Sequence, residues 1–324
     1  MTRFRFLRLL ISAILLYVCT GHAADDYPSK ALRIIVPFPA GSTADVRTRQ
    51  IAKPLAQRLG QSIIVENKPG ASGTIGNTFV AKAPPDGYTL LYVNNSSLSI
   101  APYLLRDLAY DSERDFAPIT LVATAPAVLV VPPSFAANSV RELAALARTQ
   151  PGKLTYGASG IGSAQHLPGA QFARMANIEL LLIPYKGDSE TMLDLVNNRL
   201  TMSFATPTAT LPHLKADKLK ALAVTSVKRL AILPNVPTMQ ESGFADYEWH
   251  NWFGYMAPAA TSPTVIARLH QEIAAVMQSA ALRTDFLGAG YEIVAGSPEQ
   301  FTAAVKRDQT RYRSLIRAIG LEAH

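Results

Sequence analysis

Cysteine is almost absent from this chain: its 324 residues include one, Cys19. A single thiol cannot form an internal disulfide, and it excludes the paired-cysteine spacings that hold zinc or carry redox chemistry. Charged residues are also few, at 17% of the chain, compared with roughly 25% in typical soluble domains. Lys and Arg form no stripe or cluster, so we expect no nucleic-acid partner.

The motifs of common enzymes are missing as well. The stretch Gly160-Ile161-Gly162 lacks the third glycine of the dinucleotide-binding pattern, because Gln165 stands in its place. The chain contains no P-loop and no H-E-x-x-H zinc motif. Thr74 occupies the position where a nucleophile elbow would need its second glycine. We therefore expect no catalysis, no cofactor and no bound metal.

One apolar run near the start of the chain, Leu9–Val18, covers ten residues, whereas a membrane-spanning helix needs roughly 20. Arg3, Arg5 and Arg8 precede it, and Gly21-His22-Ala23 follows with small residues at the −3 and −1 positions of a cleavage site. This order predicts a secretory signal peptide, residues 1–23, that is removed during export to the periplasm.

Cleavage after Ala23 would remove Cys19 and three of the 31 Lys and Arg residues, which lowers the net charge from +7 to +4. Two alternatives remain for this segment. It could stay in place as an uncleaved anchor helix, or Cys19 could carry a lipid. Val18 is larger than the small residue that a lipoprotein box places before its cysteine.

The hydrophobic content, 48%, is enough for a sizeable core, and the length suggests about two domains. Short β-rich runs alternate with amphipathic stretches, which favours an α/β fold with largely parallel sheets. Leu32–Val36 is an expected strand, and the helix after it ends at Gly60. We expect further strands at 63–65, 89–93, 128–131, 154–156, 180–184, 201–204, 219–225 and 252–257, and helices at 77–83, 139–148, 163–176, 191–198, 263–280 and 298–318.

The order of these elements suggests a first lobe, a second lobe and a return to the first lobe. Two crossing segments, near Val122 and Glu248, would then form a hinge. A single-sheet enzyme fold is the structural alternative, and periodicity alone does not decide between the two.

Four loops follow expected strands, at residues 37–45, 94–97, 156–166 and 205–208. In open α/β sheets, ligands bind beyond the carboxyl ends of the strands. Ser42 and Asp45 have the spacing of a capping box, so a helix begins near Thr43. The beginning of a helix presents unpaired N–H groups and partial positive charge, which suits an anion. Each loop is also compatible with an ordinary capped helix or turn that binds no ligand.

Many segments in one order resemble a known family, the substrate-binding receptors of tripartite tricarboxylate transporters, often called Bug receptors. The similarity covers nearly all of the chain after residue 23. The segments that carry it are Tyr27–Lys30, Pro37–Asp45, Val65–Ala71, Pro85–Tyr88, Asp115–Ile119, Pro151–Leu154, Ser159–Leu167, Pro184–Gly187, Leu222–Ser226, Pro234–Thr238 and Trp252–Gly254.

This resemblance implies a type II periplasmic binding protein, with two α/β lobes joined by a two-segment hinge and a ligand cleft between them. Lobe 1 would comprise residues 24–122 and 249–324, and lobe 2 residues 123–248. It implies a monomeric receptor that closes on a small carboxylate and delivers it to the membrane permease subunits of a tripartite transporter. A ligand sensor that is not coupled to transport, or a secreted enzyme on the same fold, remains an alternative.

The resemblance and the loop analysis together give one set of candidate ligand-binding residues: Phe38, Ala40, Gly41, Ser42, Asp45, Asn94, Ser96, Ser159, Gly162, Ser163, His166, Ala205, Thr206 and Pro207. The family often has Asp-Asn where this chain has Ala205-Thr206, and a second glycine where Ser42 stands. The loss of that acidic residue predicts a simple carboxylate or dicarboxylate as the ligand, rather than an amino acid.

Overall fold

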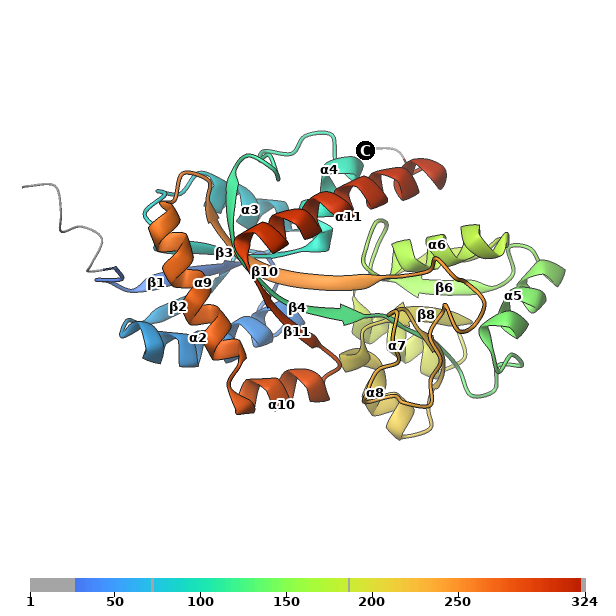
Figure 1. Ribbon diagram of the computed structural model, residues 1–324. Helices are drawn as coiled ribbons and strands as arrows, with labels where there is room; N and C mark the ends of the chain where they lie inside the picture. The colour runs from blue at the N-terminus through green and yellow to red at the C-terminus, as the bar shows by residue number, and fades with distance from the viewer. Residues whose placement is uncertain (1–26, 71–72, 186, 322–324) are drawn as a thin grey trace, which may run out of the picture.

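The computed structural model describes residues 27–70, 73–185 and 187–321, so the predicted signal peptide lies outside the described residues. Two β-sheets, each covered by helices on both faces, lie side by side and form two lobes (Figure 1). None of the helices in the described ranges is long and apolar enough to cross a membrane. The two-lobed α/β architecture predicted from the sequence is confirmed.

The first lobe contains a six-stranded sheet in the order β11-β4-β10-β3-β1-β2. Its strands are β1 (Leu32–Val36), β2 (Ile63–Asn67), β3 (Thr89–Asn94), β4 (Phe116–Pro126), β10 (His250–Pro258) and β11 (Glu292–Gly296). β1 is parallel to β2 and β3, whereas β10 is antiparallel to both of its neighbours. The carboxyl ends of β1 and β3 therefore open on one edge of the sheet, where Phe38 and Asn94 lie.

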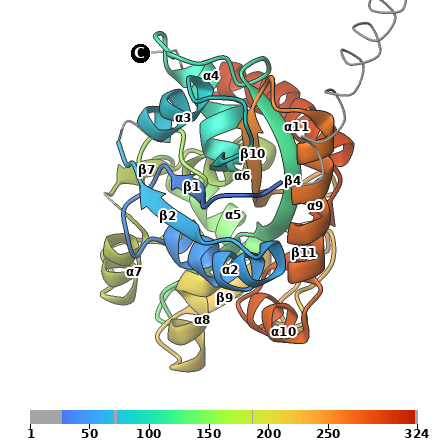
Figure 2. The ribbon, with the colours of Figure 1, turned by 90° about the vertical axis from the view of Figure 1, so that its left-hand side faces the viewer.

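Helices cover both faces of this sheet. One face packs against α2 (Thr43–Leu59), α9 (Pro263–Met277) and α10 (Ala280–Gly288). The other packs against α3 (Thr74–Ala81) and the first half of α11 (Pro298–Ala318). Seen from the end of this lobe, α3 lies above the sheet and α2 below it (Figure 2). The apolar face of α2 predicted from Ile51, Leu55 and Leu59 is buried, and Gly60 ends the helix in the left-handed region.

The second lobe contains a five-stranded sheet in the order β7-β6-β8-β5-β9. Its strands are β5 (Val128–Val131), β6 (Thr155–Ala158), β7 (Leu181–Pro184), β8 (Met202–Ala205) and β9 (Lys220–Val224). Its helices are α5 (Val140–Thr149), α6 (His166–Ala176), α7 (Asp188–Val196) and α8 (Pro207–Lys215). β6 is parallel to β7 and β8, so the loops that lead into α6, α7 and α8 open on the same edge.

The chain passes between the lobes at Ala127, which separates β4 from β5, and again at Trp249, just before β10. Thr225 ties the two crossings together: its hydroxyl group lies 2.7 Å from the Trp249 carbonyl oxygen and accepts a hydrogen bond from the Ala127 N–H at 2.7 Å. The second half of α11 leaves the first lobe, and Tyr312, Leu315 and Ile316 join the core of the second.

Several elements differ from the sequence-based expectation. The second-lobe helix expected from residue 163 begins at His166, and α7 begins at Asp188, three residues before the expected start. The strands β4 and β11 and the helices α8 and α10 were not expected. The expected loop after β3 contains one π-helical turn, Ser96–Ile100, followed by α4, Ala101–Leu104. Ile100 and Ala101 are buried there, so tertiary packing gives this segment its structure.

Candidate ligand-binding cleft

A cavity of about 490 Å³ lies between the two lobes. Loops that follow β1 and β3 line it from the first lobe, and loops that follow β6, β7 and β8 line it from the second. β10 contributes Asn251, Trp252 and Phe253 at its base. Eight of the predicted residues line this cavity: Phe38, Ser42, Asn94, Ser96, Ser159, Gly162, Ser163 and Thr206.

Several helices begin at the cavity, among them α2 and three helices of the second lobe. Residues at the beginning of each one line it: Thr43 of α2, Gln165 before α6, Asp188 of α7 and Thr206 before α8. The first N–H groups of a helix have no intrahelical partner, and the helix dipole places partial positive charge there. Among the described residues of the lining, none is Lys, Arg or His. A bound anion would therefore be held by helix ends and hydroxyl groups.

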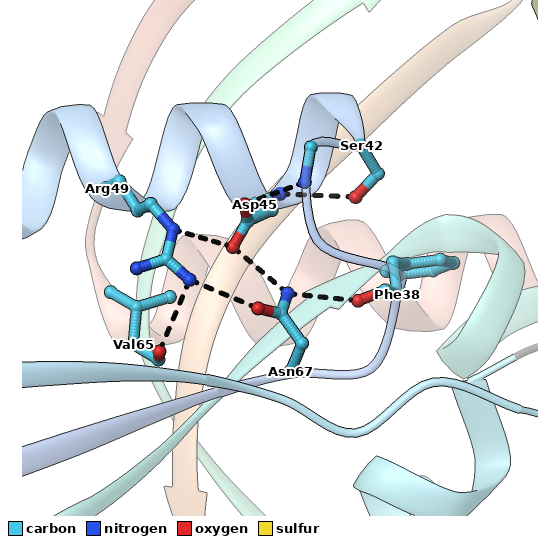
Figure 3. Close-up of polar contacts among 7 residues, drawn as sticks. Phe38, Ser42, Asp45, Arg49, Val65 and Asn67 are labelled. Atoms are coloured by element: carbon cyan, nitrogen blue, oxygen red, sulfur yellow. Dashed lines mark hydrogen bonds and ion pairs between the residues drawn. The ribbon is translucent and has the colours of Figure 1, made fainter.

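The first-lobe loop (residues 37–45) is held from behind by Asp45, as Figure 3 shows. The Asp45 carboxylate accepts hydrogen bonds from the Gly41 N–H at 2.9 Å, from Arg49 Nε at 2.9 Å and from Asn67 Nδ2 at 3.0 Å. Asn67 Nδ2 also donates to the Phe38 carbonyl at 3.1 Å. Ala40, Gly41 and Asp45 do not line the cavity. The Gly41 N–H is bonded to one oxygen of Asp45, and the other oxygen is bonded to Arg49 and Asn67.

Ser42 lines the cavity together with Phe38, Thr43 and Ala44 of this loop. Its Oγ accepts the N–H of Asp45 at 3.4 Å and so caps α2. A hydroxyl group that accepts a bond keeps its own proton to donate. The capping function read from the sequence and a contact to an anion are therefore compatible in one side chain.

In the second-lobe loop (residues 156–166), a side chain again accepts a backbone N–H of the loop, and a serine hydroxyl again lies at the beginning of a helix. The Gly162 N–H donates to His166 Nδ1 at 2.8 Å, and the His166 N–H lies 3.2 Å from Ser163 Oγ. Burial lowers the pKa of His166 to about 4, so the ring is neutral at pH 7 and Nδ1 can accept. His166 stacks on Tyr156 behind the loop and does not line the cavity, whereas Ser163 does.

The lobes touch each other at both ends of the cavity. At one end Gly162 lies so close to Leu104 of α4 that a β-carbon would overlap the leucine side chain. At the other end the hydroxyl of Thr208 donates to the Ala289 carbonyl at 3.2 Å. Pro207 packs against Gly290 there, where a β-carbon would also overlap. Pro207 thus lies at the rim, and Ala205 is buried within β8; neither lines the cavity.

Comparison with known proteins identifies the family. Residues 47–321 match the model of the tripartite tricarboxylate transporter family receptors. The chain belongs to this family. It is a family of periplasmic solute-binding receptors, as the resemblance in the sequence predicts.

Individual relatives match this chain along almost their whole length. The receptor is 32% identical to protein BugT of Bordetella pertussis over 96% of this chain and 97% of BugT. R. palustris Rpa4515, solved with adipate, has a TM-score of 0.84 and 32% identity, covering 92% of this chain and 100% of its own. The periplasmic binding protein BugD has a TM-score of 0.80 and 34% identity, covering 92% of this chain and 100% of BugD.

The cavity of the receptor also includes residues that the sequence analysis did not select. Asp188 and Gln165 line it from the second lobe, and Tyr291 lines it from the loop before β11. An apolar wall comes from the π-helical turn and α4, with Ile100, Ala101, Leu104 and Leu105. Asp188 lies between the strand β7 and the helix α7, as the residues of the other cavity loops lie between a strand and a helix. The same strand-to-helix pattern in the sequence could therefore have indicated Asp188.

We expect Asp45→Ala to lower the free energy of unfolding of the receptor by about 2–3 kcal/mol, because it removes charge-assisted bonds and leaves the Gly41 N–H unpaired. Burial opposes ionisation of Asp45, but hydrogen bonds from Arg49, Gly41 and Asn67 outweigh it and lower its pKa. This stability is therefore present above the ordinary Asp pKa and is lost as pH falls through the lower folded-state pKa. Urea unfolding of wild type and Asp45→Ala at pH 7 measures the loss of stability, and the difference between the two proteins should be smaller at pH 3.

Asp86→Ala is the matched control, because the contacts of Asp86 are exposed: it pairs with Lys30 at 3.3 Å and accepts the Tyr88 N–H at 3.0 Å. Such pairs contribute up to about 1 kcal/mol. Equal losses for the two variants at pH 7 would show that Asp45 does not hold the first-lobe loop.

Proposed function

We propose that this receptor captures a small carboxylate in the periplasm by closing its lobes and delivers it to the membrane permease subunits of a tripartite transporter, without catalysis. The observation that supports this most directly is the convergence of helix ends and hydroxyl groups from both lobes on one cavity. The relative solved with adipate supports a carboxylate. Export by the predicted signal peptide, residues 1–23, is part of the proposal.

The energetics require both lobes. One contact to a helix N-terminus contributes about 0.3–1 kcal/mol when exposed and up to ~2 kcal/mol when partly buried. Micromolar affinity needs about 8 kcal/mol. Ser42 and the start of α2 line the cavity from the first lobe, and Ser163, Thr206 and the start of α6 line it from the second, so neither lobe alone offers all of these groups. Closure about the crossings at Ala127 and Trp249 would bring these contacts together and exclude water.

The arrangement of hydroxyl groups supports binding rather than catalysis. An activated nucleophile needs a base within hydrogen-bond reach. Ser163 Oγ meets the backbone N–H of His166, while the ring Nδ1 of His166 accepts from Gly162. Thr206 Oγ1 accepts from the Ala209 N–H. Among the described groups, Ser163 and Thr206 therefore meet backbone donors rather than a side-chain base.

A thermal-shift screen of mono- and dicarboxylates of three to eight carbons, with benzoates added, tests the proposal. A ligand that binds the folded state raises the melting temperature by mass action. We expect at least one acid to do so, to bind in calorimetry, and to be recovered unchanged after incubation. Turnover of a bound acid, or no stabilisation by any acid, would contradict the proposal.

Ser163→Ala should weaken binding of the acid found in that screen about ten-fold, because one hydroxyl donor to the anion is lost. Ser139→Ala is the matched control: Ser139 also caps a helix, α5, by accepting from Glu142 at 3.2 Å, but it does not line the cavity. Calorimetry on both variants separates the loss of a cap from the loss of a ligand contact. Equal affinities would remove Ser163 from the site.

A further inference from the structure

Asp188 is the one charged side chain among the described residues that line the cavity. It is the first residue of α7, directly after Gly187, and its Oδ1 accepts a hydrogen bond from Gln165 Nε2. Gln165 is itself oriented by Ser159, whose hydroxyl lies 2.6 Å from Gln165 Oε1. This relay of three side chains, all of which line the cavity, fixes the direction of the carboxylate.

The relay leaves Asp188 Oδ2 without a protein partner among the described residues, and the carboxylate has no cation beside it in the lining. Arg47 lies near this end, with its guanidinium 5.0 Å from the Tyr291 ring, but it is paired with Asp285. Burial raises the pKa of Asp188, as expected for a desolvated carboxylate without a cation beside it among the described residues. A donor on the ligand would satisfy the free oxygen.

The charge of Asp188 distinguishes ligand classes. A second ligand carboxylate close to Asp188 would place two negative charges together in a partly desolvated site, which is unfavourable. A ligand hydroxyl or ammonium would instead form a charge-assisted hydrogen bond, the stronger kind. The family often has an acidic residue after β8, where this chain has Ala205-Thr206, and its absence points away from a ligand amine. Asp188, after β7, provides an acidic group in the same cavity.

We propose that Asp188 is a specificity-determining residue, which makes the site select a carboxylate that also carries a hydrogen-bond donor, hydroxyl or ammonium, over a dicarboxylate of the same length. This inference rests on the proposed function, because it takes a carboxylate as the anchor of the ligand. The apolar wall of Ile100, Ala101, Leu104 and Leu105 would pack against the carbon chain of that ligand and contributes no charge.

The test is calorimetry with matched sets of acids of four to six carbons. Each set contains the plain monocarboxylate, the dicarboxylate, and monocarboxylates that carry a hydroxyl or an amino group on carbon 2 or on the last carbon. For the best-bound length, we expect the tightest donor-bearing acid to bind wild type at least ten-fold more tightly than the dicarboxylate. In Asp188→Asn this ratio should fall at least ten-fold.

Asp194→Asn is the control, since it makes the same charge change on the same helix, at a residue that pairs with Arg199 and Tyr185 outside the cavity lining. It should keep the wild-type ratio. The size of the affinity loss distinguishes the two donor groups. Asp188→Asn should weaken binding of the ammonium-bearing acid more than binding of the hydroxyl-bearing acid. Asp188→Ser repeats the measurement if Asp188→Asn does not melt cooperatively.

Two outcomes would overturn the inference while leaving the proposed function intact: a wild-type preference for the dicarboxylate, or a ratio that Asp188→Asn and Asp188→Ser leave unchanged. A different result, no binding of any acid across the sets and the wider screen, would overturn the proposed function itself.

Discussion

Gly162→Ala should weaken carboxylate binding by at least 30-fold, because it places a β-carbon where the two lobes meet. Gly162 has φ of +74°, and a β-carbon there would overlap the Leu104 side chain of the opposite lobe. Leu104 lines the cavity and also packs against the second-lobe core, so moving it aside would disturb one of these contacts. The substitution should hold the lobes apart and leave each half of the site unable to bind alone.

Gly160→Ala is the control in the same loop. Gly160 also has positive φ, +105°, but nothing lies within 4 Å of the position of its β-carbon. Both variants carry backbone strain of about 1–2 kcal/mol. The difference between their carboxylate affinities therefore reports the contact with Leu104 across the cleft. In a Leu104→Ala background, the cost of Gly162→Ala should fall at least ten-fold. Equal affinities for Gly160→Ala and Gly162→Ala would show that closure at this end is not needed.

Acidification should destabilise the receptor through His166. Burial lowers the pKa of His166 from 6.5 to about 4, so between these values the unfolded chain binds a proton that the folded chain does not. Stability is then lost as pH falls through this window, by about 3 kcal/mol in total. A protonated ring can no longer accept the Gly162 N–H, so ligand affinity should fall together with stability.

His166→Asn tests this assignment, because an asparagine Oδ1 can accept from Gly162 but does not titrate. We expect the variant to be less stable at pH 7.5, since it loses the stacking on Tyr156, yet to show a flatter profile from pH 7.5 to 4. Urea unfolding of both proteins at several pH values measures the two slopes. Parallel profiles would show that His166 is not the titrating group.

The sequence located the loops of the cleft well, because strand ends and helix caps are local features. Ser42 with Asp45 predicts the beginning of α2, and Ser163 lies at the turn before α6. Since parallel strands place such loops on one edge of a sheet, Ser42, Asn94, Ser163 and Thr206 lie around one cavity. The capping pattern could not show which polar atoms are used in hydrogen bonds within the protein and which face the cavity. It therefore predicted both Ser42 and Asp45 as ligand-binding residues, although Ser42 lines the cavity and Asp45 does not.

Other parts of the site depend on contacts between distant segments. The apolar wall around Leu104 exists because α4 packs against Gly162 of the other lobe, and no pattern near residue 104 indicates this. The orientation of Asp188 depends on Gln165, 23 residues earlier. Tyr291 enters the cavity from the return of the chain to the first lobe. These features follow from how the two lobes meet, which periodicity and turn signals do not encode.

The central claim is that two lobes close on a carboxylate, and small-angle scattering tests it most directly. The radius of gyration of wild type and Gly162→Ala would be measured without ligand and with a saturating amount of the best-bound acid. We expect the acid to decrease the radius of wild type and to leave that of Gly162→Ala nearly unchanged. A bound acid that leaves the wild-type radius the same would contradict closure as the basis of capture.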